Sequence, residues 1–363
     1  MFRITLIFVF SFSLFLASCS SDDKYTDVPD PDPVSPVVLD LTAVPYQNLS
    51  DYKFFEGPIK DQNPSYGVVP YEPISSLFTD YALKKRFVWM PKEVKASYNT
   101  DGTVFNFPTG SVLIKNFYYD NVQPGGVRRI IETRLLIKKA SGWIFAEYVW
   151  NDDQTEATLN MNGAFTSVSW LDSNGDLQTV DNYRIPSGSE CLICHKIFDE
   201  AKPIGPKPQN LNSNYNFAEG TSNQLSKWIN FGYLDNSLPS LITTVVDYKD
   251  SSKSLNMRVR SYLDIQCAHC HQQDSHCDYR PIRLAFSETT SAANLGICVP
   301  PDEVVDPSIT NIVTPGNVMR SMMHFRLNTN EEQYRMPLIG RSVIHNEGVE
   351  LIEEWINSLN GCN

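Results

Sequence analysis

Basic residues are in deficit in this chain of 363 residues, which has 30 Lys and Arg against 42 Asp and Glu and a formal net charge of −12 at pH 7. Nucleic-acid binding relies on clustered Lys and Arg, so the composition argues against a nucleic-acid partner. Beyond its N-terminal segment, the sequence also has no apolar run long enough to span a bilayer. A hydrophobic fraction of 42% still allows a full core, which excludes wholesale disorder.

The N-terminal segment has the pattern of an export signal. Arg3 precedes an apolar run over 4–16 that is too short for a transmembrane helix. The junction Leu16-Ala17-Ser18-Cys19 resembles the lipoprotein box of exported bacterial proteins. The resemblance implies cleavage of the signal peptide 1–18 and lipidation of Cys19; an ordinary signal peptide is the alternative. We expect an exported protein in the periplasm or at the cell surface, anchored to a membrane by its lipid.

Two C-x-x-C-H motifs are the strongest chemical signal in the chain. They are Cys191-Leu192-Ile193-Cys194-His195 and Cys267-Ala268-His269-Cys270-His271. On a helical turn, cysteines at i and i+3 share one face, so both thiols can form thioether links to one porphyrin edge. The following histidine can turn its imidazole onto the iron. The sequence therefore predicts two covalently bound haems c, linked by Cys191, Cys194, Cys267 and Cys270 and ligated by His195 and His271.

Three other interpretations explain the motifs less well. One zinc held by both cysteine pairs would need a much shorter separation than that between Cys194 and Cys267. A thioredoxin-like redox pair needs a strand–helix setting, which neither motif has. Structural disulfides suit an exported protein but leave the histidine of each motif unexplained.

Met336 is the predicted distal ligand of the second haem. It lies about 65 residues after His271, in Tyr334-Arg335-Met336-Pro337-Leu338-Ile339-Gly340-Arg341. Methionine opposite histidine is a common haem ligand in cytochromes c, and Pro337 favours a loop. The alternative is a methionine that fills a gap in the core.

The sequence leaves the distal ligand of the first haem open. No methionine occurs between His195 and Asn256. A histidine or a five-coordinate iron remains an alternative to the other methionines, which are Met90, Met161, Met257, Met319, Met322 and Met323. We expect His269 to be a spacer within the second motif, and His276, His324 and His345 to be solvated or structural; of these, His324 lies in a segment that could line a haem pocket.

Three further cysteines follow the haem motifs. The exported setting favours a disulfide, and we predict a pair between Cys277 and Cys298. Cys362 would then be unpaired, unless it displaces one of the two.

The expected fold class is α+β. A Pro- and Asp-rich tether over 19–45 leads into an antiparallel β-rich domain over 46–185, with strands at Val104–Phe107, Ser111–Tyr119, Arg129–Lys139 and Trp143–Trp150. A mainly α-helical, cytochrome c-like dihaem region should follow, divided into a first haem segment over 186–250 and a second haem domain over 251–363. Its expected helices are Leu225–Gly232, Ser254–Gln266 and Asn346–Leu359.

Several strings in the chain resemble a family of exported bacterial dihaem c-type cytochromes with an N-terminal β-rich region. Besides the two haem motifs, they are Pro73-Ile74-Ser75-Ser76-Leu77-Phe78-Thr79-Asp80-Tyr81-Ala82, Phe107-Pro108-Thr109-Gly110, Ile131-Glu132-Thr133-Arg134-Leu135-Leu136, Tyr148-Val149-Trp150-Asn151-Asp152 and Met336-Pro337-Leu338-Ile339-Gly340-Arg341. The resemblance covers about residues 46–360. It implies two covalent haems, an electron-transfer role and electron acceptance from an exported quinoprotein-type dehydrogenase.

Three functions compete at this stage. The first is a membrane-tethered electron carrier with a redox partner protein, either a donor dehydrogenase or another cytochrome, and no catalytic residues of its own. The second is a dihaem peroxidase-like enzyme, in which the first haem stays open for substrate. The third is a module that binds a partner protein or a carbohydrate through the β-rich half, with an accessory haem domain.

Overall fold

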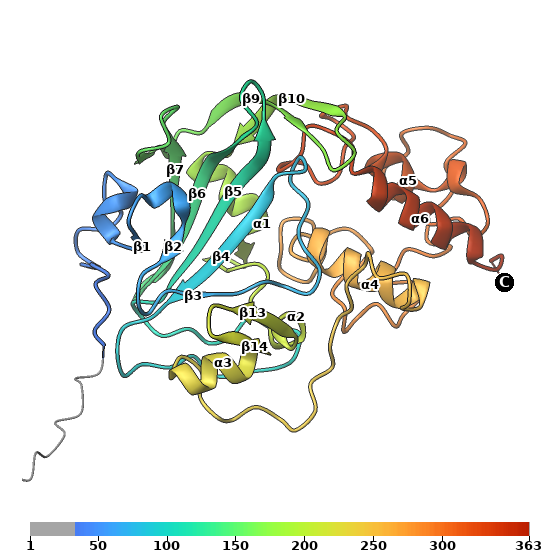
Figure 1. The fold of residues 1–363 in the computed structure, drawn as a ribbon. Helices are drawn as coiled ribbons and strands as arrows, with labels where there is room; N and C mark the ends of the chain where they lie inside the picture. The colour runs from blue at the N-terminus through green and yellow to red at the C-terminus, as the bar shows by residue number, and fades with distance from the viewer. Residues whose placement is uncertain (1–32, 363) are drawn as a thin grey trace, which may run out of the picture. The chain divides into compact units, whose positions relative to one another are not determined.

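An eight-stranded antiparallel sheet forms the centre of the fold (Figure 1). The computed structural model describes residues 33–362, so the predicted signal peptide and Cys19 lie outside the described residues. Six strands run in the order β3–β4–β5–β6–β7–β8, and the hairpin β9–β10 joins the end of β5 through the pair Val122↔Trp170. The strands are β3 Val69–Pro70, β4 Leu83–Trp89, β5 Val112–Val122, β6 Val127–Lys139, β7 Gly142–Trp150, β8 Ala157–Leu159, β9 Ala164–Leu171 and β10 Leu177–Ile185.

The predicted fold class is wrong in its second half. Strands account for 26% of the chain and helices for 18%, and the sheets are antiparallel. A mainly α-helical haem region is absent from the described residues because long loops, held by turn hydrogen bonds, occupy most of the chain between short helices. None of the helices in residues 33–362 combines the length and apolar character that crossing a membrane requires.

Three of the four predicted strands are confirmed, as β5, β6 and β7. The fourth, Val104–Phe107, is wrong: this segment makes only an isolated bridge between Ser97 and Asn106. Its aromatic side chains, Phe105 and Phe107, point instead into an apolar core beside Trp228. Burial of these rings, rather than strand pairing, accounts for the apolar character of the segment.

The two faces of the sheet differ in chemistry. On one face, Phe87, Ile114, Leu135 and Ala146 lie side by side on β4 to β7 and pack in an apolar core. The helical turns η1 (Leu49–Tyr52) and η2 (Ile59–Asp61) and the hairpin of β1 (Phe55–Glu56) and β2 (Asn63–Pro64) belong to the segment that covers this core. Val37, Leu39 and Leu41, at the end of the predicted tether, pack on it as well.

On the opposite face, the neighbouring positions are charged. Arg86 pairs with Lys115, Lys115 with Arg134, and Arg134 with Glu147, across β4, β5, β6 and β7. Alternate residues of a strand point to opposite faces, so these four side chains form one row across the sheet, here called the charged row. A charged row in the middle of a covered face indicates a site rather than a core.

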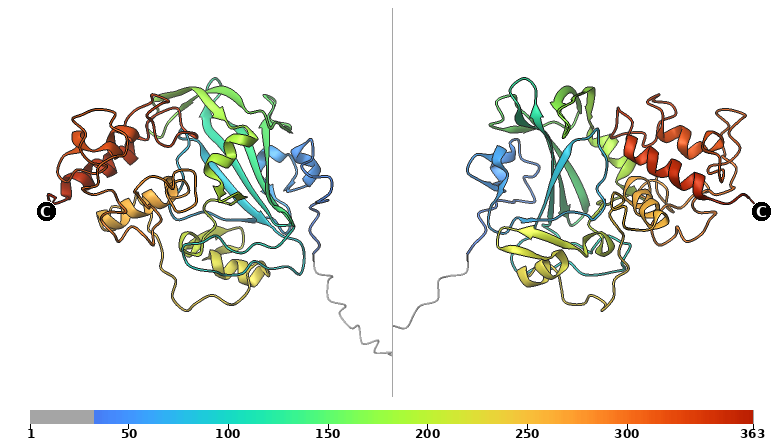
Figure 2. Two further views of the ribbon diagram at one scale, coloured as in Figure 1. Left: turned by 180° about the vertical axis from the view of Figure 1, so that it is seen from behind. Right: turned by 45° about the vertical axis from the view of Figure 1, so that its right-hand side comes forward.

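The segment that carries the first haem motif lies against this second face. Its elements are α1 Gly188–Cys194, β11 Lys196–Ile197, β12 Glu200–Ala201, α2 Pro208–Leu211, β13 Asn214–Phe217, β14 Gly220–Asn223 and α3 Gln224–Phe231. Helix α1 and strand β12 contact β7, and the view from behind places α1 in front of the sheet (Figure 2). The predicted helix Leu225–Gly232 is confirmed as α3.

The last part of the chain packs three short helices around a separate apolar core (Figure 2). These are α4 Leu255–Gln266, α5 Met322–Leu327, preceded by the turn η3 Val318–Arg320, and α6 Asn346–Ser358. Helix α4 and helix α6 confirm two predicted helices. Loop residues between α4 and α5, among them Leu284 and Val313, complete the core.

The predicted disulfide between Cys277 and Cys298 is wrong. Cys298 is bonded to Cys362, with the two Cα atoms 5.8 Å apart, while Cys277 is a buried free thiol. The chain end returns past the loop that carries Cys298 after α6 ends at Ser358. Cys277 is held elsewhere, because its amide donates to the carbonyl of Cys270 inside the second haem motif.

Candidate functional site

The first C-x-x-C-H motif lies on a capped helical turn. Ser187 and Glu190 form a capping box at the start of α1, which ends at Cys194 with His195 as its C-cap residue. The hairpin β11–β12 brings Lys202 back to this end, where its carbonyl accepts a hydrogen bond from His195 Nδ1 over 2.8 Å. This bond fixes the tautomer and leaves Nε2 of His195 free, the arrangement that is typical of histidines that bind a metal.

Cys191, Cys194 and His195 line a cavity of about 1050 Å³, here called the first cavity. Its floor is the second face of the sheet, including Lys115, Arg134 and Glu147 of the charged row. Apolar side chains complete the wall, among them Leu77, Phe78, Leu113, Leu136, Phe145, Pro337 and Ile339.

Ion pairing in the charged row is concentrated on Arg134. Its guanidinium contacts Glu132 at 2.6 Å and Glu147 at 3.2 Å, and Glu132 also accepts a hydrogen bond from Tyr183. Burial and the neighbouring Glu132 raise the pKa of Glu147 well above its ordinary value. Although burial acts against it, Arg134 lowers the pKa of Glu132. One carboxylate therefore balances Arg134, and the other tends to hold a proton.

Lys115 has no comparable partner. The described residues offer its amine no hydrogen bond and no ion pair; its nearest recorded neighbour is the ring of Phe117, with the nitrogen 4.6 Å from the centroid. Burial, followed by the charges of Arg86 and Arg134, lowers the pKa of Lys115 well below its ordinary value. The pKa of His195 falls to about 4, mainly through burial, and Lys115 is among the charges that lower it.

The second motif begins where α4 ends. Ser254 caps the helix, and Cys267 is its C-cap residue, so the helix delivers the motif directly. Cys267, His271 and Met336 line a second cavity of about 710 Å³. The rest of its wall is largely apolar, with Leu263, Leu284, Ile312, Met322, Met323 and Leu327, while Arg280, Glu303 and Arg326 stand together at one side. Residues far apart in sequence thus meet at one site.

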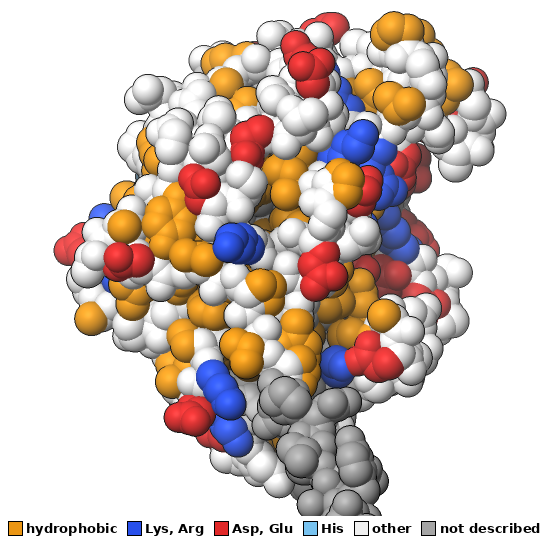
Figure 3. All heavy atoms as spheres, turned by 60° about the vertical axis from the view of Figure 1, so that its left-hand side comes forward, with side chains coloured by type: hydrophobic (Ala, Val, Ile, Leu, Met, Phe, Trp, Pro, Cys, Tyr) orange, Lys and Arg blue, Asp and Glu red, His pale blue; other side chains and the backbone are white. Residues whose placement is uncertain are grey.

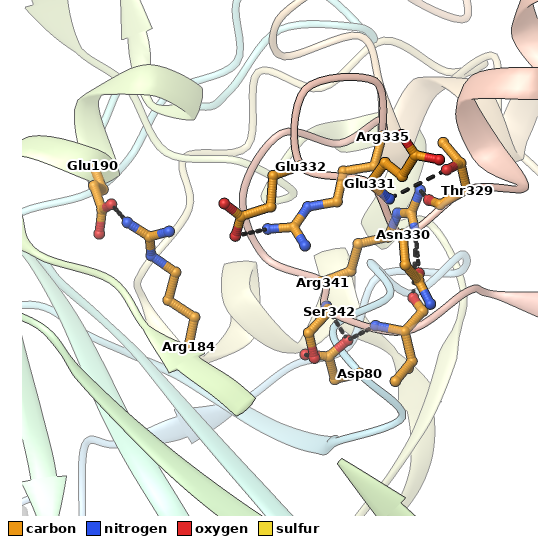
Figure 4. Close-up of polar contacts among 11 residues, drawn as sticks. Asp80, Arg184, Glu190, Thr329, Asn330, Glu331, Glu332, Arg335, Arg341 and Ser342 are labelled. Atoms are coloured by element: carbon orange, nitrogen blue, oxygen red, sulfur yellow. Dashed lines mark hydrogen bonds and ion pairs between the residues drawn. The ribbon is translucent and has the colours of Figure 1, made fainter. Parts of the chain in front are cut away.

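The loop that carries Met336 is fixed by a buried arginine (Figure 4). Arg341, 4% exposed, donates from Nε to the carbonyl of Met336 at 3.0 Å. Its other nitrogens donate to five more oxygens, namely the carbonyls of Arg326, Leu327, Thr329 and Val343 and the side chain of Asn330. One guanidinium therefore ties both ends of the loop to the end of α5.

Asp80, which precedes β4, anchors the same loop from the sheet side. Its carboxylate accepts from the backbone amides of Ser342 and Val343 and from the Ser342 hydroxyl, at 2.6, 3.0 and 2.9 Å (Figure 4). Pro337 and Ile339 of the loop reach the first cavity, while Met336 reaches the second. The loop therefore separates the two cavities. Pro337 signals the loop in the sequence, but neither anchor was predicted.

The two C-x-x-C-H motifs touch each other. Cys270 Sγ lies 3.6 Å from the carbonyl of Ile193, and ligand atoms of Cys194, His269 and Cys270 lie within 4.8 Å of one another. Only the second cysteine of each motif takes part: Cys191 and Cys267 line different cavities. The four cysteines therefore do not surround one zinc ion, as the four-cysteine interpretation requires. Cys194, His269 and Cys270 are near enough to one another to share a metal ion.

None of the remaining candidate methionines lines the first cavity. Met322 and Met323 line the second. Met90 is buried in an apolar core, Met161 packs against Gly188, Met257 lies beside Arg260, and Met319 is 76% exposed.

The other histidines lie in separate settings. His324 contacts Glu353 at 2.7 Å, His276 is exposed, and His345 stacks on Phe78 with ring centroids 4.1 Å apart. His269 lies against both second cysteines, with its Nδ1 buried and unpartnered.

No protein-family model, no curated protein and no solved structure matches this chain.

Proposed function

We propose that this protein is a dihaem c-type cytochrome that transfers electrons. The observation that carries the proposal is the second cavity, where Cys267, His271 and Met336 meet although 65 residues separate the histidine from the methionine. These are one thioether cysteine and both iron ligands of a c-type haem with a histidine and a methionine on the iron. The second cysteine, Cys270, joins the same three residues in a smaller neighbouring cavity. When bound, haem iron supplies one-electron chemistry between its two oxidation states.

The donor sets of both cavities fit one haem each. Each cavity has the first cysteine and the histidine of its own motif in its wall, and each is largely apolar. His195 has one ring nitrogen engaged and the other free, while Nδ1 of His271 is buried without a partner among the described residues. A buried imidazole with one free nitrogen is suited to bind iron.

Contact between the motifs supports electron exchange within the molecule. Because Cys194 and Cys270 are neighbours, haems attached to them would have adjacent edges. The Met336 loop lies between the cavities, so it orients an iron ligand on one side and closes the other cavity with Pro337 and Ile339. Burial and axial ligands are the means by which the protein would set the two potentials.

The redox partner in this proposal is a protein, either an exported quinoprotein-type dehydrogenase or another cytochrome, as the family resemblance implies. The lipid at Cys19 would hold the protein at a membrane. The net charge of −12 favours a basic partner face, although the face in Figure 3 scatters acidic and basic side chains among hydrophobic ones. We therefore expect association that weakens moderately with salt.

A peroxidase-like enzyme is the second candidate. It is favoured by the first cavity, which has no methionine in its wall and places Arg134 and a proton-holding Glu147 there. Such a pair could bind and protonate a peroxide at an open iron. In that case one haem of the purified protein is high-spin and consumes peroxide, whereas an electron carrier has two low-spin haems.

The haem count tests the proposal directly. The full chain, produced in a host that matures c-type cytochromes, is assayed by pyridine haemochrome and by intact mass. We expect two covalent haems in the unaltered protein and one in each double variant, Cys191→Ser/Cys194→Ser and Cys267→Ser/Cys270→Ser. Cys277→Ser, a buried free thiol beside the second motif, is the control and should retain two. A colourless protein, or pigment extracted completely by acidified organic solvent, refutes the proposal.

A further inference from the structure

We propose that the amine of Lys115 is the distal iron ligand of the first haem. The inference rests on the dihaem function proposed above, and it concerns a position that the sequence leaves open. It starts from the shared cavity: Lys115 rises from the middle of β5 into the first cavity, and His195 lies in the wall of the same cavity.

The other donors of the first cavity are already engaged or displaced. Arg134 is held by Glu132 and Glu147, and a guanidinium stays protonated and does not ligate iron. His269 also lines this cavity, but its ligand nitrogen lies within 4.8 Å of the sulfurs of Cys194 and Cys270, at the contact between the two motifs. No methionine is available in the wall. Lys115 is the remaining nitrogen donor of this cavity.

The surroundings of Lys115 suit a ligand better than a structural charge. Within residues 33–362 the amine of Lys115 has neither an ion pair nor a hydrogen bond. Lys84 on β4 is equally unpaired and lies over the same Phe117 ring, so the feature that distinguishes Lys115 is its place in the wall of the first cavity. Arg86 and Arg134 flank Lys115 on the neighbouring strands, so positive charge is crowded at this point of the row. Loss of its proton to solvent removes that repulsion and exposes the lone pair that binds a metal.

The position of Lys115 on the sheet agrees with this role. Helix α1 packs on β7, and β5 lies two strands away, a distance of about 10 Å at the usual spacing. Lys115 on β5 and His195 at the end of α1 thus line one cavity from two different elements.

Ligation by Lys115 also bears on the choice of function. It fills the sixth position at the first haem and leaves no open iron for a peroxide. Confirmation of Lys115 as a ligand would therefore favour the electron carrier over the peroxidase-like enzyme.

Three variants of the haem-loaded full chain test the assignment. Lys115→Ala removes the amine, and Lys115→Arg keeps the positive charge but provides no ligand. Lys84→Ala is the matched control, because Lys84 lies on the neighbouring strand β4 without lining the cavity and likewise has no hydrogen bond or ion pair among the described residues. Spin state is measured by electron paramagnetic resonance and near-infrared magnetic circular dichroism, and open positions by carbon monoxide binding to the reduced protein.

We expect two low-spin haems that bind no carbon monoxide in the unaltered protein and in Lys84→Ala. In both Lys115 variants, one haem of two should become high-spin and bind carbon monoxide, while the methionine–iron charge-transfer band of the second haem persists and shows that the protein is folded. If the first haem stays low-spin in Lys115→Arg but becomes high-spin in Lys115→Ala, the positive charge matters rather than the amine. Lys115 would then be a charge partner of the haem propionates and not an iron ligand. An unaltered protein with a high-spin haem also overturns the assignment. A haem count below two, in contrast, refutes the proposed function itself.

Discussion

Replacement of Arg341 by methionine should detach Met336 from the second haem without abolishing the fold. Arg341 is buried, and its guanidinium donates to the carbonyl of Met336 and to five other oxygens at 2.8–3.3 Å. Removing one partner of a buried charged group typically costs about 3–5 kcal/mol, because the other polar groups are left unsatisfied. Domains of ordinary size have a free energy of unfolding of about 5–15 kcal/mol, so the variant should fold with reduced stability.

The loss of stability in Arg341→Met should be concentrated in the Met336 loop, because the oxygens left without a donor belong to residues 326–343. On a chain of this size, we expect the Tm to fall by roughly 5–10 °C. The specific readout is the methionine–iron charge-transfer band, which should weaken strongly in Arg341→Met and vanish in Met336→Ala. Potentiometric titration should show a lower potential for the second haem in both variants, since methionine ligation raises it.

Arg258→Met is the control for loss of a half-buried arginine outside the loop. Arg258 on α4 donates to the carbonyl of Tyr248 and makes no contact with the Met336 loop in the described hydrogen bonds. The Arg258→Met variant should have a lower Tm and an unchanged methionine–iron charge-transfer band. If Arg341→Met is destabilised as expected but keeps the full band and potential, the loop holds Met336 by other means and the reasoning is refuted.

Three further predictions concern other parts of the molecule. Burial lowers the pKa of His345 to about 4 in the folded protein, from an ordinary value of 6.5. As the pH falls, the unfolded chain therefore binds the proton before the folded protein does. The free energy of unfolding should be unaffected above pH 6.5 and lower by roughly 2 kcal/mol at pH 5. In thermal melts at acidic pH, His345→Phe should lose less stability than the unaltered protein, whereas a variant of the exposed His276 should lose as much. The same pH dependence in His345→Phe and in the unaltered protein would contradict the role of His345. Cys362→Ser removes the disulfide to Cys298, which closes a loop with a sequence separation of 64. The free energy of unfolding measured by chemical denaturation should fall by about 2–4 kcal/mol. An unchanged value would show that the disulfide is absent in solution. Asp80→Asn should weaken the same methionine–iron band as Arg341→Met but less, because the amide oxygen still accepts from the amides of Ser342 and Val343; an unchanged band would show that the sheet-side anchor is dispensable.

The local motifs could be predicted from the sequence because they depend on short spacing. The C-x-x-C-H strings, the strands β5 to β7 and the helices α3, α4 and α6 follow from periodicity and residue type. The segment Val104–Phe107 shows the limit of such patterns, since its rings are buried by tertiary packing rather than by strand pairing. The mainly helical haem region was also wrong, because apolar residues of irregular loops, such as Leu284 and Val313, build its core without helical periodicity.

The disulfide illustrates why pairing is decided in three dimensions. Cys277 is close to Cys298 in sequence, but its backbone is bonded to the second haem motif, while Cys362 is brought back by the end of α6. Closeness in the sequence therefore does not predict the disulfide partner of Cys298.

What the sequence alone determined was the chemistry available: four motif cysteines, two adjacent histidines and Met336. Only the tertiary structure decided which of these groups share a cavity, that Arg341 and Asp80 hold the Met336 loop, and that Lys115 and His195 both line the first cavity. The physical reason is one of range. Spacing along a strand or helix orients only residues a few positions apart. The register of strands β4 to β7 and the burial of the Arg341 guanidinium, in contrast, are set by tertiary packing, which brings together residues more than 60 positions apart.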